Sequence, residues 1–99
     1  MILWQTAERW TREGRNCEIQ RPDVNGAAQL RGLVEVETGL SDRALAAAPV
    51  ATPRRKHRPK RHSDGEYREW VCFSRAGEEV KSLREAVNEL AEYVAENEL

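Results

Sequence analysis

The sequence predicts a single small α+β domain. Three observations support this fold class: the length of the chain, a helical pattern at its C-terminal end, and a segment rich in β-favouring residues just before that pattern. Ninety-nine residues are about the size of one typical domain, and a chain of this length can bury one modest core. We therefore expect residues 1–99 to form one domain.

The C-terminal pattern predicts a helix over residues 82–96. Apolar residues from Ala76 onward are spaced alternately four and three apart, which places them on one side of a helix. Ser82-Leu83-Arg84-Glu85 reads as a capping box, so residues 77–81 are either a first helical turn or a short strand. The strict spacing is also typical of a dimer seam, and the alternative is that the stripe closes the core of the monomer. The expected dimer contacts are Val80, Leu83, Val87, Leu90 and Val94.

The two segments before this helix differ in composition. Residues 66–73 are rich in aromatic and β-favouring residues and follow the turn pattern Ser63-Asp64-Gly65, which predicts a strand. Three prolines (at 49, 53 and 59) exclude a regular helix in the preceding stretch and argue against a central strand. We therefore expect residues 49–65 to be a flexible, basic loop or wing.

The N-terminal half is less regular. Residues 27–37 have apolar spacing compatible with a helix that ends at Gly39, and Ser41 is a suitable N-cap for a second helix that must stop near Pro49. In the first twenty residues, Leu3, Ala7 and Trp10 have helical spacing. The alternative is a hairpin with its turn at residues 12–16. The helix is slightly favoured.

Composition narrows the functional classes. The chain has no apolar run long enough to cross a bilayer and no signal-peptide pattern at its N-terminus, and its two cysteines are too few for a disulfide framework. We expect a cytoplasmic protein with no membrane contact. No phosphate-binding loop, nucleophile motif, metalloprotease motif or paired CxxC occurs, so we expect no enzyme activity, no cofactor and no metal. The alternative of a zinc site would have to use Cys17, His57, His62 and Cys72, which lack zinc-ligand spacing.

Charge is segregated along the chain. The net charge is -1, but residues 50–65 carry six Lys or Arg against one acidic residue, and residues 66–99 carry four against nine. A basic, proline-containing segment can follow a phosphate backbone, which favours nucleic acid as the partner over an acidic protein surface or a merely solvated loop. The expected phosphate contacts are Arg54, Arg55, Lys56, Arg58, Lys60 and Arg61.

Three segments in order resemble winged helix-turn-helix DNA-binding regulators over about residues 26–96. Thr38-Gly39-Leu40-Ser41-Asp42-Arg43-Ala44-Leu45 is similar to the turn and the start of the recognition helix in that family. Residues 64–71 resemble the tip and return strand of the wing, and residues 73–80 resemble the joint between that strand and the next helix. The resemblance implies a winged-helix domain with a long C-terminal helix that acts as a small transcriptional regulator. Ser41, Asp42 and Arg43 would then face the major groove, with the basic run on the wing.

A second interpretation is a ββα-type module. Strands at 66–73 and 78–81 followed by the helix at 82–96 would make such a unit, completed by a second unit from the N-terminal half. Modules of this size in phages and other mobile genetic elements often block a host protein, including nucleic-acid-binding complexes. The contact surface would then be the basic segment or the acidic side of the helix, which carries Glu85, Glu89, Glu92 and Glu96.

Overall fold

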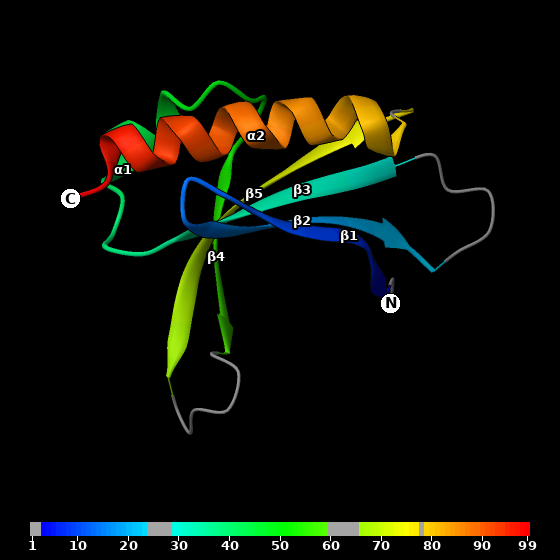
Figure 1. The fold of residues 1–99 in the computed structure, drawn as a ribbon, viewed down its shortest axis with the longest axis horizontal. Helices are drawn as coiled ribbons and strands as arrows, with labels where there is room; N and C mark the ends of the chain where they lie inside the picture. Colours follow the sequence, from blue (N-terminus) through cyan, green and yellow to red (C-terminus); the bar gives the residue numbers. More distant parts are fainter. Residues whose placement is uncertain (1–2, 24–28, 60–65, 78) are drawn as a thin grey trace.

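The chain forms a five-stranded antiparallel sheet with a long helix on one face (Figure 1). The structure is a computed structural model that describes residues 3–23, 29–59, 66–77 and 79–99. Its elements are β1 (Trp4–Arg12), β2 (Arg15–Pro22), β3 (Gln29–Val36), α1 (Asp42–Ala46), β4 (Arg54–Pro59), β5 (Tyr67–Ala76) and α2 (Val80–Asn97). The strands lie side by side in the order β1-β2-β3-β5-β4. The predicted α+β class is confirmed.

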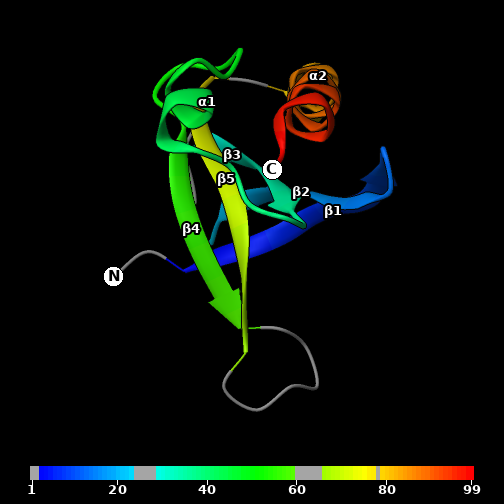
Figure 2. The same ribbon diagram turned by 90° about the vertical axis from the view of Figure 1, so that its left-hand side faces the viewer.

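Helix α2 covers one face of the sheet and packs on β3, β2 and β1 (Figure 2). We call this side of the sheet the covered face and the opposite side the open face. The core lies between α2 and the covered face, where the strands contribute Cys17, Ile19, Val34, Val36, Val71 and Phe73. The helix predicted over 82–96 is confirmed, although it begins earlier, at Val80.

The apolar stripe of α2 is used inside the monomer. Leu83, Val87, Leu90 and Val94 have no exposed surface, and Val80 packs against the same core while partly buried. The prediction that these residues form a dimer seam is therefore wrong, and the alternative that they close the monomer core is confirmed. The physical reason is that the covered face needs an apolar layer, and α2 provides it.

The first twenty residues form a hairpin, so the slightly favoured helix is wrong. β1 and β2 are joined by Glu13 and Gly14, which have φ values of 55° and 73°, the positive values that two-residue hairpin turns need. The strand register shifts between Thr6 and Glu8, which leaves a bulge at Ala7. Ala7 and Trp10 both pack against the core. Because of the bulge, Ala7 and Trp10 face the same side of the sheet although they are three residues apart, a spacing that is typical of a helix.

The helix expected over residues 27–37 is also wrong, because residues 29–36 form the central strand β3; residues 27 and 28 lie outside the described part of the chain. A central strand is buried on both faces, so apolar residues do not alternate cleanly along it. Here Leu33 is buried on the open face while Val34 is buried on the covered face, which produces a helix-like pattern. Gly32 allows close packing, since a Cβ there would lie 2.6 Å from Cγ2 of Val87.

Helix α1 begins as predicted. The Ser41 hydroxyl accepts a hydrogen bond from the Ala44 N–H at 3.1 Å, Gly39 has a φ of 105°, and Leu40 is buried in the core. The helix is only five residues long and ends at Ala46, before the expected stop at Pro49. Because the element before Gly39 is β3, the described residues there contain one helix and not a helix-turn-helix pair.

The strand predicted over 66–73 is confirmed as part of β5. Within the loop or wing expected over 49–65, residues 54–59 form a strand, β4, so the loop alternative is wrong for these six residues and the wing alternative stays a prediction. β4 is an edge strand, as the prolines allow, and Pro59 is its last residue. The predicted turn at 63–65 lies outside the described residues.

The start of α2 corrects two further expectations. Glu79 is the N-cap and its side chain makes no capping hydrogen bond, so Ser82 and Glu85 lie within the helix and form no capping box at its start. Val80 and Lys81 are helical, so the second short strand of the ββα interpretation is absent there. β5 instead runs on to Ala76, which removes Ala76 from the helical stripe.

Candidate nucleic-acid interface

The open face carries side chains from all five strands. The strand register places Arg9, Glu18, Leu33, Cys72 and Arg54 in one row that crosses the whole sheet. Only Leu33 in this row is a large apolar residue, and it is fully buried. The open face is therefore mainly polar, with few buried apolar residues, in contrast to the apolar covered face.

Strand β4 divides the predicted basic run between two sides of the sheet. Arg54, Lys56 and Arg58 lie on the open face, because their partners on β5 do, whereas Arg55 and His57 lie on the other side. Lys60 and Arg61 lie outside the described residues. The run therefore does not act as one continuous surface.

Three cations on the open face lack a carboxylate partner among the described residues. They are Arg31, Arg54 and Lys56, and all three act electrostatically on Cys72. Burial lowers the pKa of Lys56, and the neighbouring Arg31 and Arg58 lower it further. Burial and the Arg58 charge likewise lower the pKa of Arg31. Arg31 and Lys56 are partly withdrawn from water and are repelled by neighbouring cations, whereas Arg54 is exposed. A bound anion would stabilise Arg31 and Lys56 in particular.

Arg31 is held in place by two neutral groups. Its guanidinium lies 4.1 Å from the centre of the Trp4 ring, and its Nε donates a hydrogen bond to Oε1 of Gln20 at 2.6 Å. Neither contact neutralises the charge. Arg31 is thus positioned by β1 and β2 while its charge stays available.

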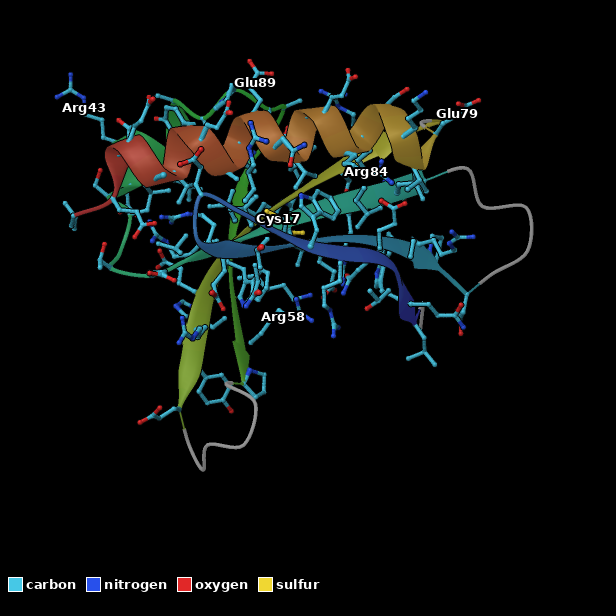
Figure 3. The ribbon with its side chains drawn as sticks, in the orientation of Figure 1. Cys17, Arg43, Arg58, Glu79, Arg84 and Glu89 are labelled. Atoms are coloured by element: carbon cyan, nitrogen blue, oxygen red, sulfur yellow. The ribbon has the colours of Figure 1, made fainter. Side chains whose placement is uncertain are left out.

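Arg58 forms a second guanidinium–indole pair, with Trp70. Its guanidinium carbon lies 4.6 Å from the centre of the Trp70 ring, and its Nη2 lies 3.4 Å from Oε2 of Glu18. Arg58 lies on the side of the sheet away from α2 (Figure 3). Its Nη1 is buried and has no hydrogen-bond partner among the described residues. That atom is a donor without an acceptor.

Two buried carboxylates of the open face differ in how well they are satisfied. Glu18 accepts hydrogen bonds from Nε2 of Gln20 at 2.5 Å and from Nε of Arg9 at 3.2 Å. Glu35 has only long contacts, with Nδ2 of Asn16 at 3.4 and 3.5 Å and with Nη1 of Arg68 at 3.4 Å. Glu35 therefore keeps more capacity to accept hydrogen bonds than Glu18.

Some of these groups, among them Arg58, Glu18 and Glu35, line a cavity of about 580 Å³ on the open face, whereas the three unpaired cations do not line it. This size falls in the range of about 300–1,000 Å³ for small-molecule sites. The lining includes the Arg58–Trp70 pair together with Glu35 and Asn16. In the whole lining, three arginines balance three glutamates. The cavity favours a ligand that both donates and accepts hydrogen bonds.

Arg55 has a structural role in place of the predicted phosphate contact. Its Nη1 donates to the Leu40 carbonyl at 2.8 Å and to Oε1 of Glu69 at 2.5 Å, and its Nη2 donates to Oδ1 of Asp42 at 2.8 Å. The hydrogen bond to Glu69 is the main reason that the pKa of Arg55 is raised. These contacts tie α1 to the β4–β5 hairpin and leave no free charge on Arg55.

The same contacts change the role of the predicted major-groove residues. The Ser41 hydroxyl caps α1 and Asp42 pairs with Arg55, so both side chains have partners within the domain. Arg43 is exposed and points away from the sheet (Figure 3). Of these three residues, only Arg43 makes no side-chain hydrogen bond or ion pair with another described residue, so it alone is free to bind an outside partner.

The sequence analysis missed Arg31, Trp70 and Glu35. All three lie in strands, and two are in β3, which was expected to be a helix. The available signal was the alternation in Leu30-Arg31-Gly32-Leu33-Val34-Glu35-Val36, where polar residues occupy every other position except for Leu33.

The described residues contain no grouping of three or more His, Cys, Asp or Glu that could hold a metal ion. Cys17 lies on the covered face and Cys72 on the open face, which separates two members of the alternative zinc quartet. No helix in the described part of the chain is long and apolar enough to span a membrane. Comparisons with protein-family models, curated proteins and solved structures found no match to this chain.

Proposed function

We propose that this chain is a non-enzymatic, cytoplasmic DNA-binding protein that holds the phosphate backbone on the open face of its sheet. The observation that carries the proposal is the set of unpaired cations Arg31, Arg54 and Lys56 on that face. The chain has seventeen acidic residues against sixteen basic ones, so it has enough carboxylates to pair with every cation. Cations that gather without acidic partners in such a chain favour an external anion.

The distribution of acid supports the same orientation. Glu85, Glu89 and Glu96 are exposed on α2 and have no ion-pair partner among the described residues. Glu89 points away from the sheet (Figure 3). DNA would be attracted to the open face and repelled by α2, so the domain would bind in one orientation.

The finer hypothesis is a transcriptional regulator of winged-helix type in which α1 serves as the recognition helix and the strand β3, not a helix, precedes it. It is supported by the order of α1, the β4–β5 hairpin and α2, which is the order of recognition helix, wing and following helix in that family. On this hypothesis Arg43 reads a base edge, and Arg43→Ala would relax discrimination at one base pair by about 1–3 kcal/mol without changing nonspecific affinity. The open-face proposal does not need this contact.

The test is a binding titration with a mixed-sequence 20-mer, both as a duplex and as a single strand, over a series of salt concentrations. The variant is Arg54→Gln with Lys56→Gln, and its charge-matched control is Arg21→Gln with Lys81→Gln, two exposed cations away from the open face. If each open-face cation meets one phosphate, the slope of log K against log salt becomes shallower in the variant by about 1.8 for the duplex and about 1.4 for the single strand, and it stays unchanged in the control. Equal losses in the two double variants would contradict the proposal.

A second candidate function is a small module of a phage or other mobile element that blocks a host nucleic-acid-binding complex. It is favoured by the exposed acidic side of α2, which resembles nucleic acid in its charge. It predicts that the wild-type protein binds neither form of the 20-mer and forms a stable complex with a host protein. The same titration therefore separates the two functions.

A further inference from the structure

The open face has a second feature beside its phosphate-binding cations, and it concerns the bases. Strands β3, β5 and β4 place Glu35, Trp70 and Lys56 in one cross-strand row. Neighbouring strands are about 4.8 Å apart, so the outer two residues of the row are roughly 10 Å apart at the backbone. This separation is comparable to the reach of one nucleotide from its base edge to its phosphate.

The middle of this row offers a flat surface for stacking. The Arg58 guanidinium lies over the Trp70 ring and is anchored at its side by Glu18. The Arg58 side chain is 26% exposed, so part of it remains accessible. Bases in single strands stack on guanidinium planes as well as on aromatic rings. A base placed on Arg58 would also lie close to its unpartnered Nη1 donor.

One edge of the stacking surface is an acceptor. Glu35 lines the same cavity as Arg58 and Trp70, its side chain is 7% exposed, and its contacts with Asn16 and Arg68 are all 3.4 Å or longer. A carboxylate only accepts hydrogen bonds, and its two oxygens fit two neighbouring donors. Among the bases, guanine alone presents two adjacent donors, N1–H and N2–H, on its Watson–Crick edge. Asn16 provides an amide donor near the same carboxylate, where it can reach the guanine O6.

We propose that this cavity binds a guanine base of single-stranded DNA, with the base stacked on Arg58, its Watson–Crick edge on Glu35 and its phosphate on Lys56. The inference rests on the proposed DNA-binding function and adds a strand state and a base to it. A single strand is required because the Watson–Crick edge is occupied in a duplex. The mixed charge of the cavity lining fits a base, which is neutral and carries donors and acceptors, better than it fits a phosphate.

The experiment measures the affinity for three fluorescent oligonucleotides that differ at one base: a thymine 12-mer, the same 12-mer with one central guanine, and the same with hypoxanthine in place of that guanine. Hypoxanthine keeps N1–H and O6 but lacks the N2 amino group. We expect guanine to bind about 10-fold or more tighter than thymine, and hypoxanthine to lose most of this gain. Since this comparison uses wild-type protein, it does not depend on the folding of a variant.

The matched variants are Glu35→Gln and Glu37→Gln, which remove one negative charge each from the lining of the same cavity. Glu37 is exposed and is not part of the Arg58–Trp70 stacking pair, so its variant should keep the guanine preference. Glu35→Gln should bind all three oligonucleotides equally, with its affinity for the thymine 12-mer retained. Equal binding of guanine and thymine by the wild type would overturn the base site and leave the DNA-binding function standing. If the wild type binds none of these single strands but does bind the duplex 20-mer, only the base site is overturned; if it binds neither the single strands nor the duplex, both proposals are overturned.

Discussion

The two faces of the sheet are both buried to a large extent, but by different means. The covered face is closed by α2, whose Leu83, Val87 and Leu90 leave no surface exposed. In the described part of the chain no helix covers the open face, and the two large apolar residues buried there, Leu33 and Trp70, are shielded by side chains of the sheet itself, including Arg58. One face is therefore sealed by a separate element, whereas the other is covered by charged groups that an outside molecule can displace or join.

This difference indicates how the small domain divides its tasks. Burial of apolar surface on the covered face stabilises the fold, at about 25 cal/mol for each Å² removed from water. On the open face, Glu18 is buried but satisfied, while Arg31, Arg54 and Lys56 have no carboxylate partner among the described residues. Unpaired charge destabilises a fold slightly and favours binding. We therefore assign stability to the covered face and the proposed binding to the open face.

The largest expected effect is on the covered face. Phe73→Ala removes a fully packed ring from the core and should lower the free energy of unfolding by about 3–5 kcal/mol. Tyr67→Ala, in the same strand, is the control, because Tyr67 is 63% exposed and should change stability by less than about 0.5 kcal/mol. Urea unfolding followed by circular dichroism measures both. Similar losses in the two variants would show that the division between the faces is wrong.

A second prediction uses Cys17 on the covered face. Burial raises the pKa of its thiol from the ordinary value of 9.0 to about 11. A raised pKa stabilises the folded state while the thiol is protonated, so this contribution is complete below about pH 9 and is lost as the pH rises through 11. The difference corresponds to about 2–3 kcal/mol.

The measurement is urea unfolding at pH 8 and at pH 11 for the wild type, Cys17→Ala and Cys72→Ser. Wild type and Cys72→Ser should both lose the Cys17 contribution at the higher pH, and Cys17→Ala should lose the least, relative to its own value at pH 8. Because burial also raises the pKa of the Cys72 thiol, Cys72→Ser should lose somewhat less than the wild type. If all three proteins lose the same amount, Cys17 is not buried as described.

A smaller effect is expected at Gly32, where the two faces share a strand. A methyl group added there would lie 2.6 Å from Cγ2 of Val87 and 2.8 Å from Cε1 of Phe73, so α2 or the ring must shift. Gly32→Ala should destabilise the domain by about 1–3 kcal/mol. Gly14→Ala is no suitable control because Gly14 has a positive φ; Ser74→Ala, at an exposed strand position, should be close to neutral and serves instead. A stabilised Gly32→Ala protein would argue against the tight contact between α2 and β3.

Local signals in the sequence predicted some elements well. The apolar residues of α2 keep helical spacing over most of its length, and β5 is rich in aromatic and β-favouring residues. Ser41 caps α1 through a side-chain hydrogen bond to Ala44, which lies only three residues away. The prolines also predicted that residues 54–59 are not a central strand, and β4 indeed lies at the edge of the sheet. Proline has no backbone N–H to donate to a neighbouring strand, and this holds whatever the rest of the fold is.

The other elements depend on partners far along the chain. β3 has an apolar residue on each face because it is central, and this position is set by pairing with β2 and β5. The bulge at Ala7 disturbs the alternation of β1, which hid the hairpin. The candidate site shares this limit: Arg54, Lys56 and Arg58 could be selected by their charge, but Arg31, Glu35 and Trp70 join them only through strand pairing.

The most direct test of the binding face uses the three tryptophans as reporters. Trp4 and Trp70 lie against open-face arginines, whereas Trp10 packs against the core and its Nε1 donates to Oδ1 of Asn88 in α2 at 2.8 Å. We would follow the three indole N–H signals of ¹⁵N-labelled protein by NMR during titration with DNA. The account predicts that the Trp70 and Trp4 signals shift and that the Trp10 signal does not. A shift of Trp10 with Trp70 unchanged, or shifts confined to the amides of α1, would contradict it.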